Sequence, residues 1–185
     1  MNQERVIISK QRFWLTIERL CHQLIEEFDD FENTCIVGVQ ERGVMLSDRI
    51  YERLVDITGI KDIPYGKLDI TFYRDDFRHR TKPLSPSHTK MDFLVEGKNV
   101  ILIDDVLYTG RTIQAAMSAL NDFGRPRRVE LLVLVDRRFN RHLPIQADFK
   151  GITVDALDEA YVKVAWSDQH NEDQILLYPD KKLVE

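Results

Sequence analysis

Apolar and polar positions alternate along the chain with two different periods. Between residues 11 and 28, apolar side chains recur every three or four positions, which predicts an amphipathic helix. The same period predicts helices over residues 44–56 and 112–123. Short apolar runs and period-two stretches predict strands, which are residues 35–39, 67–73, 100–103, 129–135, 161–166 and 175–178.

These periods also predict which side chains face the core. The first helix is expected to bury Trp14, Ile17, Leu20, Cys21, Leu24, Ile25 and Phe28. The helix at 112–123 is expected to bury Ile113, Ala116, Met117 and Leu120. Because buried strands alternate with helices, we expect an α/β fold with a central, twisted, mainly parallel sheet of four or five strands flanked by helices.

Composition bounds the class of protein. The chain has 185 residues, of which 43% are hydrophobic and 31% charged, typical of one globular domain. No apolar run reaches the length of a membrane span and the start lacks a secretory leader, so we expect a cytoplasmic protein without membrane contact. Cys21 and Cys35 stand in apolar segments without ligand-like spacing and are expected to be reduced core thiols.

Polar residues follow four predicted strands directly. Residues 40–43 follow one strand, residues 73–76 another, Asp104 and Asp105 a third, and residues 136–137 a fourth. In open α/β sheets, ligands bind at the carboxyl ends of the strands. Four polar ends converging on one edge therefore predict an active site there.

The central motif, residues 100–112, indicates the chemistry of that site. Thr109, Gly110 and Thr112 open a helix, whose first backbone N–H groups attract a phosphate. Neither GxxxxGK[ST] nor GxGxxG is present. Asp104 and Asp105, about 5 Å apart, repel each other by roughly 3 kcal/mol at an effective dielectric near 20. Ribose hydroxyls or Mg²⁺ would offset this repulsion, so the motif predicts a site for a phosphorylated ribose that carries a pyrophosphate.

The segment "VILIDDVLYTGRT" at residues 100–112 resembles the 5-phosphoribosyl-1-pyrophosphate signature of type I phosphoribosyltransferases. The chain is more closely similar to one branch, the bifunctional pyrimidine operon attenuators with uracil phosphoribosyltransferase activity. The similar segments are "MNQERVIIS", "CIVGVQERG", "KLDITFYRDD", "VLVDR" and "LPIQADFKG". The resemblance implies a single domain over residues 1–185, with a lid loop at about 74–95 and a small hood mainly from residues 136–178.

The resemblance also implies roles for individual residues. It implies that Asp104, Asp105 and Arg42 are catalytic, and that Mg²⁺ is held at the two aspartates through water and substrate. The loop of residues 40–43 resembles the family's pyrophosphate loop, whose backbone commonly contains a cis peptide. The implied substrate-binding residues are Glu41, Arg42, Arg74, Asp104, Asp105, Val106, Leu107, Tyr108, Thr109, Gly110, Arg111, Thr112, Arg137 and Val162. Arg137 and Val162 belong to the hood that, in the family, reads the base through backbone groups. The lid residues Arg78, Arg80 and Lys82 are expected either to fold over a phosphate or to be ordinary solvated charges.

Three positions depart from related sequences. Purine-using relatives carry an aspartate where this chain has Tyr108, so the resemblance favours a pyrimidine base. Gln40 replaces a commonly basic residue, which weakens the expected pyrophosphate binding. Residues 138–140 replace a shorter, glycine-containing stretch and predict a differently shaped hood.

The family's second activity is binding of pyrimidine operon leader mRNA, promoted by uridine nucleotides. The candidate basic residues are Arg19, His22, Arg125, Arg127, Arg128 and Arg141. The net charge of −5 argues against bulk coating of nucleic acid. Three functions stay open: an enzyme making UMP from uracil and phosphoribosyl pyrophosphate, an RNA-binding attenuator that uses the site to sense UMP, and a phosphoribosyltransferase for another base. The resemblance further implies a homodimer or a larger homo-oligomer.

Overall fold

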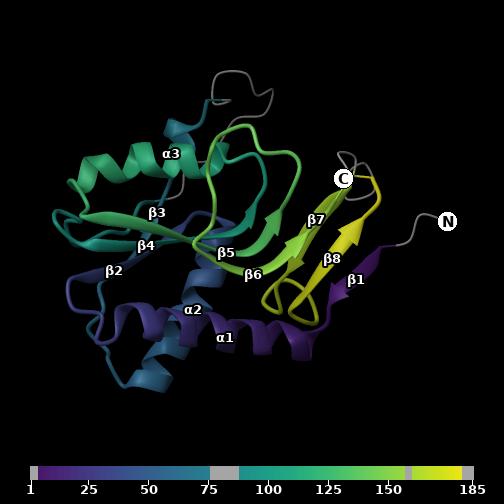
Figure 1. Ribbon diagram of the computed structural model, residues 1–185, viewed down its shortest axis with the longest axis horizontal. Coiled ribbons are helices and arrows are strands. Elements are labelled where there is room, and N and C mark those ends of the chain that lie inside the picture. The colour runs from purple at the N-terminus through teal and green to yellow at the C-terminus, as the bar shows by residue number, and fades with distance from the viewer. Residues whose placement is uncertain (1–3, 76–87, 157–159, 181–185) are drawn as a thin grey trace.

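A five-stranded parallel sheet forms the centre of the molecule in a computed structural model that describes residues 4–75, 88–156 and 160–180 (Figure 1). Each pair of neighbouring strands in this sheet runs parallel. The strand order is β3 (Tyr65–Leu68), β2 (Thr34–Val39), β4 (Asn99–Leu107), β5 (Arg128–Arg137) and β6 (Phe149–Val154). This arrangement confirms the predicted α/β fold.

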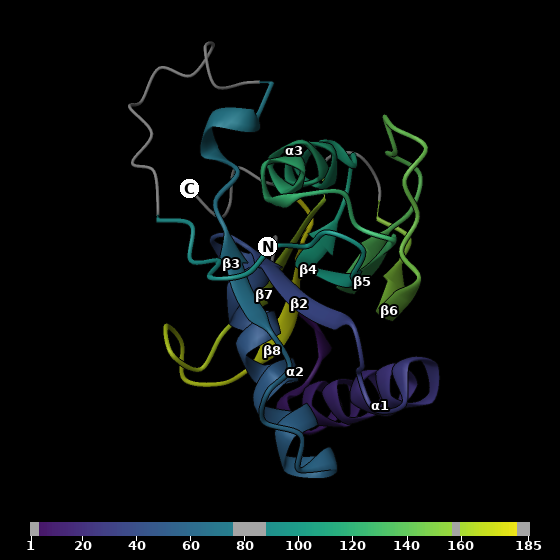
Figure 2. The same ribbon diagram turned by 90° about the vertical axis from the view of Figure 1, so that its left-hand side faces the viewer.

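Helices cover both faces of the central sheet. Helices α1 (Lys10–Phe28) and α2 (Arg42–Thr58) lie against one face and α3 (Arg111–Leu120) against the other (Figures 1 and 2). Side chains of β4 alternate accordingly: Ile101 and Ile103 join the core on the α1 and α2 side, and the residues beside them join the core on the α3 side. Because both faces are buried, the strands read as unbroken apolar runs.

The predicted helices are confirmed in position, but two predicted inward side chains are wrong. Trp14 is 42% exposed and Met117 is 39% exposed. The buried stripe of α1 instead contains Phe13, against whose ring the Trp14 ring packs edge-on at 6.3 Å between centroids. Periodicity fixes the buried face of a helix to within about one residue, so a side chain at the margin of the stripe is easily misplaced.

The predicted strand at 67–73 is wrong in its second half. Strand β3 ends at Leu68, and a 3₁₀ turn, η1 (Thr71–Tyr73), follows. The Asp69 carboxylate accepts hydrogen bonds from the Thr71 N–H at 2.8 Å and the Thr71 hydroxyl at 2.5 Å. Such a local side-chain bond competes with strand pairing and turns the backbone away from the sheet.

Strand β4 extends four residues beyond the predicted 100–103, so Asp104 and Asp105 belong to the strand rather than follow it. The extension is held by β5, with which β4 pairs up to the level of Leu107 and Asp136. Strand β6 is not among the predicted elements.

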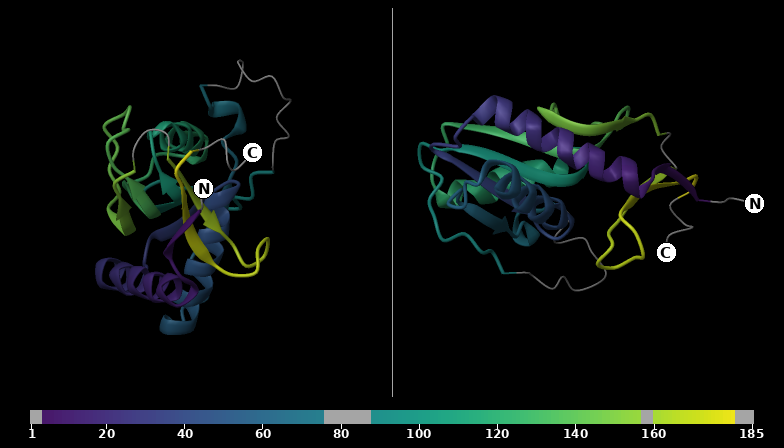
Figure 3. Two further views of the ribbon diagram at one scale, coloured as in Figure 1. Left: turned by 90° about the vertical axis from the view of Figure 1, so that its right-hand side faces the viewer. Right: turned by 90° about the horizontal axis from the view of Figure 1, so that it is seen from below.

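A second, antiparallel sheet of three strands lies beside the carboxyl end of the central sheet (Figure 3). Its order is β1 (Arg5–Ile8), β8 (Gln174–Tyr178) and β7 (Tyr161–Ala165). The hood was expected mainly from residues 136–178. Strand β6 of that range joins the central sheet, and β1 from the start of the chain completes the small sheet. The small sheet and α1 share one hydrophobic core.

Most of the predicted lid, residues 76–87 with Arg78, Arg80 and Lys82, lies outside the described residues. In the described part of the chain no helix combines the length and apolarity needed to cross a bilayer. Cys21 and Cys35 are buried free thiols, as predicted, and burial raises the pKa of each to about 12.

Candidate active site

Two adjacent aspartates near the end of β4, Asp104 and Asp105, form the centre of the site and are called the carboxylate pair below. They are 6% and 5% exposed. The Asp104 carboxylate accepts a hydrogen bond from the backbone N–H of Asp105 at 2.9 Å. The Oδ2 atom of Asp105 is buried and has no hydrogen-bond partner among the described residues. A buried carboxylate oxygen without a partner is costly, so this atom is placed to meet a ligand.

The electrostatics of the carboxylate pair favour a ligand that brings positive charge or hydroxyl donors. Burial raises the pKa of both carboxyl groups above the ordinary aspartate value. Repulsion from Asp105 raises the pKa of Asp104 further, and the nearby Arg42 lowers the pKa of both groups in part. A cation or a diol at this place would stabilise the charged forms that burial disfavours.

The loop after β2 brings Arg42 to the carboxylate pair. The peptide bond between Gln40 and Glu41 is cis, as the family resemblance implied. Arg42, the first residue of α2, donates a hydrogen bond from Nη1 to the Tyr161 hydroxyl at 3.0 Å. Burial alone lowers the pKa of Arg42, but the Tyr161 hydrogen bond and the charges of the carboxylate pair outweigh it and raise that pKa. Arg42 therefore stays cationic at the site.

Helix α2 begins in direct contact with β4 because its second residue is glycine. A Cβ atom added to Gly43 would lie 2.5 Å from the carbonyl oxygen of Ile103 and 3.0 Å from Cα of Asp104. A residue with a side chain would separate the helix from the strand. The close approach therefore sets the position of Arg42 relative to the carboxylate pair.

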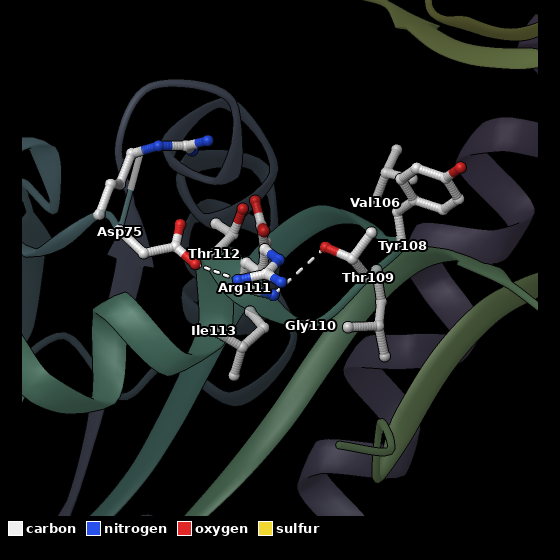
Figure 4. A pocket seen from close by; sticks show the side chains of 11 residues that line it. Asp75, Val106, Tyr108, Thr109, Gly110, Arg111, Thr112 and Ile113 are labelled. Atoms are coloured by element: carbon white, nitrogen blue, oxygen red, sulfur yellow. Dashed lines mark hydrogen bonds and ion pairs between the residues drawn. The ribbon is translucent and has the colours of Figure 1, made fainter. Parts of the chain in front are cut away.

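The turn from β4 into α3 presents backbone N–H groups to a pocket. Gly110 precedes the helix with a φ of 91°, in the left-handed region that favours glycine. The unpaired N–H groups of the first helical turn attract anions. Figure 4 shows Thr109, Gly110, Arg111 and Thr112 around the pocket, with the Tyr108 ring directed away from Arg111.

The segment after β5 supports this turn from behind. The backbone N–H of His142 donates to the Thr109 carbonyl oxygen at 3.0 Å. Arg141 donates to the carbonyl oxygen of Tyr108 and to the carboxylate of Asp136. Arg141 was predicted from the sequence as a candidate RNA contact. Its guanidinium instead makes hydrogen bonds to residues that line or adjoin the pocket.

Three adjoining cavities lie around Val106, and the carboxylate pair contributes to the lining of the first two. The first has a volume of about 490 Å³ and is lined by Arg74, Asp75, Asp104 and residues 106–113. The second has a volume of about 300 Å³ and is lined by residues 40–42, Ile70, Thr71, Arg74, residues 104–106 and Thr112. The third has a volume of about 230 Å³ and is lined by Arg42, Val106, Tyr108, Arg137 and residues 160–162. Val106 lines all three, so the cavities are direct neighbours.

The third cavity lies between the two sheets. The guanidinium of Arg137 stacks over the Tyr108 ring at 4.0 Å from its centroid and donates to the carbonyl oxygen of Ala160 at 2.9 Å. Val162 lies on β7, which among the described residues has a strand neighbour, β8, on one side only. The backbone groups on the open side of an edge strand are available to a ligand.

The structure brings together every substrate-binding residue predicted from the sequence, since each lines one or more of the three cavities. It also adds two residues that the sequence interpretation missed. Tyr161 lines the third cavity, and its hydroxyl accepts a hydrogen bond from Arg42. Asp75 lines the first cavity and pairs with Arg111; its position directly after Arg74 was the available signal.

The six candidate RNA residues do not form one surface. Arg125, Arg127 and Arg128 lie at the amino end of β5, whereas Arg141 contacts Tyr108 at the carboxyl end of the sheet. The side chain of Arg19 donates to the carbonyl oxygen of Gly151 at 2.5 Å.

The chain was compared with known families and proteins. Residues 7–169 match the phosphoribosyl transferase domain. The chain is 39% identical over 177 residues to the bifunctional protein PyrR of Caldicellulosiruptor bescii, covering 96% of each chain. It is 43% identical to the bifunctional protein PyrR of Picosynechococcus sp., covering 92% of this chain and 95% of the relative.

Solved structures share the fold. A hypoxanthine phosphoribosyltransferase of Staphylococcus aureus superposes with a TM-score of 0.68 at 19% identity, covering 98% of this chain and 94% of the other. The hypoxanthine phosphoribosyltransferase of Trypanosoma cruzi gives a TM-score of 0.69 at 14% identity, covering 96% and 97%. The domain match and the long, well-conserved alignments agree with the resemblance predicted from the sequence: the chain belongs to the phosphoribosyltransferase family and, within it, to the bifunctional PyrR proteins.

Proposed function

We propose that the protein transfers the 5-phosphoribosyl group from 5-phosphoribosyl-1-pyrophosphate to uracil, forming UMP and pyrophosphate. The observation that carries this proposal is the set of three adjoining cavities around Val106. They supply a helix N-terminus for the 5-phosphate, a cationic loop for the pyrophosphate and an open strand edge for the base. The carboxylate pair lies where the ribose would join these three parts.

The ribose is held by its hydroxyl groups in this proposal. The carboxylate pair is buried, and Oδ2 of Asp105 lacks a partner in the described part of the chain. Ribose hydroxyls can donate to these oxygens, which offsets the cost of burying charge. The 5-phosphate then reaches the turn of residues 108–112, as the sequence predicts.

Mg²⁺ fits the donor set of the carboxylate pair. Burial raises the pKa of both carboxyl groups, so a nearby cation would stabilise their charged forms. Residues 4–75, 88–156 and 160–180 contain no group of three or more His, Cys, Asp or Glu side chains able to hold a metal. The pair would therefore give the ion at most two protein carboxylates, and substrate oxygens and water would supply the rest. When bound, the ion neutralises charge on the departing pyrophosphate.

Catalysis in this proposal consists of positioning and electrostatics. The bond from the ribose to pyrophosphate breaks as the bond to uracil forms, and positive charge develops on the ribose. In this proposal Asp104 and Asp105 stabilise that charge, and Arg42 stabilises the departing pyrophosphate. Holding Arg42 through Tyr161 keeps this cation in place before the reaction.

The base is read at the third cavity. The open edge of β7 around Val162 offers backbone N–H and C=O groups, which complement the alternating carbonyl and N–H groups of uracil. Arg137 donates a guanidinium N–H to the carbonyl oxygen of Ala160 and stacks on the Tyr108 ring, so these contacts fix its position in the wall of the cavity.

Replacing Asp105 with Asn tests the proposal. The variant keeps the shape of the side chain but removes a charge from the carboxylate pair, and we expect UMP formation to fall by about 10²-fold or more. Asp155→Asn, which changes an exposed aspartate paired with Arg138, is the matched control and should keep full turnover. Wild-type turnover in a folded Asp105→Asn protein would refute the mechanism.

We also propose, from the bifunctional relatives, that the protein binds pyrimidine operon leader mRNA and that uridine nucleotides promote this binding. The exposed residues Arg125, Arg127 and Arg128 are the favoured contact. Arg127→Gln should weaken binding of the RNA and reduce the slope of log affinity against log salt by about one. An unchanged slope would exclude Arg127 from the RNA surface.

We further propose, from the family resemblance, that the protein forms a homodimer or a larger homo-oligomer. Light scattering in solution would measure the mass of this assembly.

A further inference from the structure

The pocket beside the turn of residues 108–112 contains an acidic side chain, which is unexpected in a site for an anion. Asp75 and Arg111 both line the 490 Å³ cavity. They form an ion pair across it, drawn as a dashed line in Figure 4. Arg111 is the first residue of α3, so its guanidinium lies beside the N–H groups that attract a phosphate. An acid at this place competes with the phosphate for the same cation.

The ion pair is suited to being exchanged. The Asp75 and Arg111 side chains are each 49% exposed. Pairs between half-exposed charges contribute little to stability, because water solvates both groups and salt screens them. A phosphate bound at the helix N-terminus adds backbone hydrogen bonds that a single carboxylate does not make. The phosphate therefore replaces Asp75 at Arg111 at small cost.

We propose that Asp75 is an internal counter-anion of the phosphate subsite: it occupies Arg111 when the subsite is empty and releases it when a phosphorylated ribose binds. The inference rests on the proposed function, since it takes the turn of residues 108–112 as the 5-phosphate subsite. Asp75 thereby lowers affinity for every ligand that carries this phosphate. For the product UMP, lower affinity means faster release after the pyrophosphate has left.

The size of the effect follows from charge repulsion. Two anions that share one guanidinium lie about 6 Å apart, and at a water-like dielectric each pair of unit charges changes a binding constant about three-fold. A phosphate dianion beside Asp75 therefore binds about three- to ten-fold more weakly than it would beside a neutral side chain. Salt reduces the factor, so it is largest at low ionic strength.

The test is a titration of UMP and of uridine, which lacks the phosphate, into the full-length wild-type protein, Asp75→Asn, Arg111→Gln and the double variant at low ionic strength. Asp75→Asn should bind UMP about three- to ten-fold more tightly and uridine unchanged. Arg111→Gln should weaken UMP binding, and Asp75→Asn should tighten UMP binding less in that background than in the wild type, because the competition for Arg111 is gone and only the repulsion between Asp75 and the phosphate remains. Asp29→Asn is the control for net charge: Asp29 follows the end of α1 at the amino end of the sheet, and its φ of 51° suits asparagine.

Three outcomes would overturn the inference, and they differ from one another. If the wild-type protein binds UMP more tightly than uridine but Asp75→Asn changes neither affinity, Asp75 is not a counter-anion and the phosphate subsite stands. If the wild-type protein binds UMP and uridine equally, the subsite itself is wrong, and the role of Asp75 is refuted with it. Equal tightening of UMP by Asp75→Asn and Asp29→Asn would also refute a local role.

Discussion

The contact between α2 and β4 makes Gly43→Ala a sharp test of how the site is positioned. The added Cβ would lie 2.5 Å from the Ile103 carbonyl oxygen and 3.0 Å from Cα of Asp104. Both are backbone atoms of a central strand, so neither can rotate away. The start of α2 must therefore move, and Arg42 moves with it.

The expected magnitudes follow from this geometry. Restoring an ordinary contact at the Ile103 oxygen requires a shift of about 1 Å, and misplacing a group by about 1 Å can reduce the rate about 10²-fold. Overpacking costs about 1–3 kcal/mol of unfolding free energy, and the better helix propensity of Ala returns up to about 1 kcal/mol. We expect Gly43→Ala to lose about 10²-fold in kcat/KM for phosphoribosyl pyrophosphate but only about 1–2 kcal/mol of stability.

Gly59→Ala at the other end of α2 is the matched control. Gly59 has a φ of 75°, and a Cβ added there meets no atom within 4 Å. The left-handed backbone costs Ala about 1 kcal/mol, so this variant loses similar stability without moving Arg42. Urea unfolding and steady-state kinetics on both variants compare the two effects. Wild-type kcat/KM in Gly43→Ala, or equal losses of activity in both, would refute the positioning argument.

Three further predictions concern charge and hydrogen bonding. The pKa of each carboxyl group in the carboxylate pair is higher in the folded protein than in the unfolded chain. The folded, ligand-free protein therefore keeps protons that the unfolded chain has already released. The resulting stabilisation is present at acid pH and is lost as pH rises from about 4 through the raised pKa values. Above neutral pH, the free energy of unfolding of Asp105→Asn should therefore exceed that of the wild type by an amount on the order of 2 kcal/mol. A difference between the urea midpoints of the two proteins that stays constant with pH would contradict this. Tyr161→Phe removes the acceptor for Arg42 and should raise KM for phosphoribosyl pyrophosphate about three- to ten-fold while uracil KM changes less; an unchanged KM would show that Arg42 is held without it. Arg49→Met removes the ion-pair partner of Asp173, whose side chain is 3% exposed, and should lower the free energy of unfolding by about 3 kcal/mol. Adding Asp173→Asn to that variant should restore part of this loss. A loss below about 0.5 kcal/mol would mean that the hydrogen bonds from Ser167 are enough to stabilise the buried Asp173 carboxylate.

Local patterns predicted the parts of the fold that local interactions determine. The buried strands predicted at residues 35–39, 100–103 and 129–135 and the three helices follow from burial on one or both faces, which produces a regular apolar pattern in the sequence. The end of β4 does not follow from its own residues, because it depends on pairing with β5 near Asp136. Likewise β1 has four residues and is stable as a strand only through β8, more than 160 positions away along the chain.

The candidate site shows the same division. The carboxylate pair, the turn of residues 108–112 and Arg42 belong to contiguous motifs, so the sequence contains their signal. Asp75, Tyr161 and the supporting role of Arg141 depend on contacts with residues 36, 119 and 33 positions away, respectively. Contacts between residues so far apart leave no repeating pattern of apolar positions in the sequence. An arginine that donates to a backbone carbonyl also cannot be distinguished, in the sequence, from one that faces solvent.

Nucleotide formation from phosphoribosyl pyrophosphate and Mg²⁺, with uracil, orotate, hypoxanthine or guanine as the base, decides between the three functions. We expect UMP from uracil and no nucleotide from the other three bases. Nucleotide from hypoxanthine or guanine would contradict the assignment of the base cavity. No product from any base, in a folded protein that still binds UMP, would contradict the enzyme assignment and favour an attenuator that uses the site as a sensor.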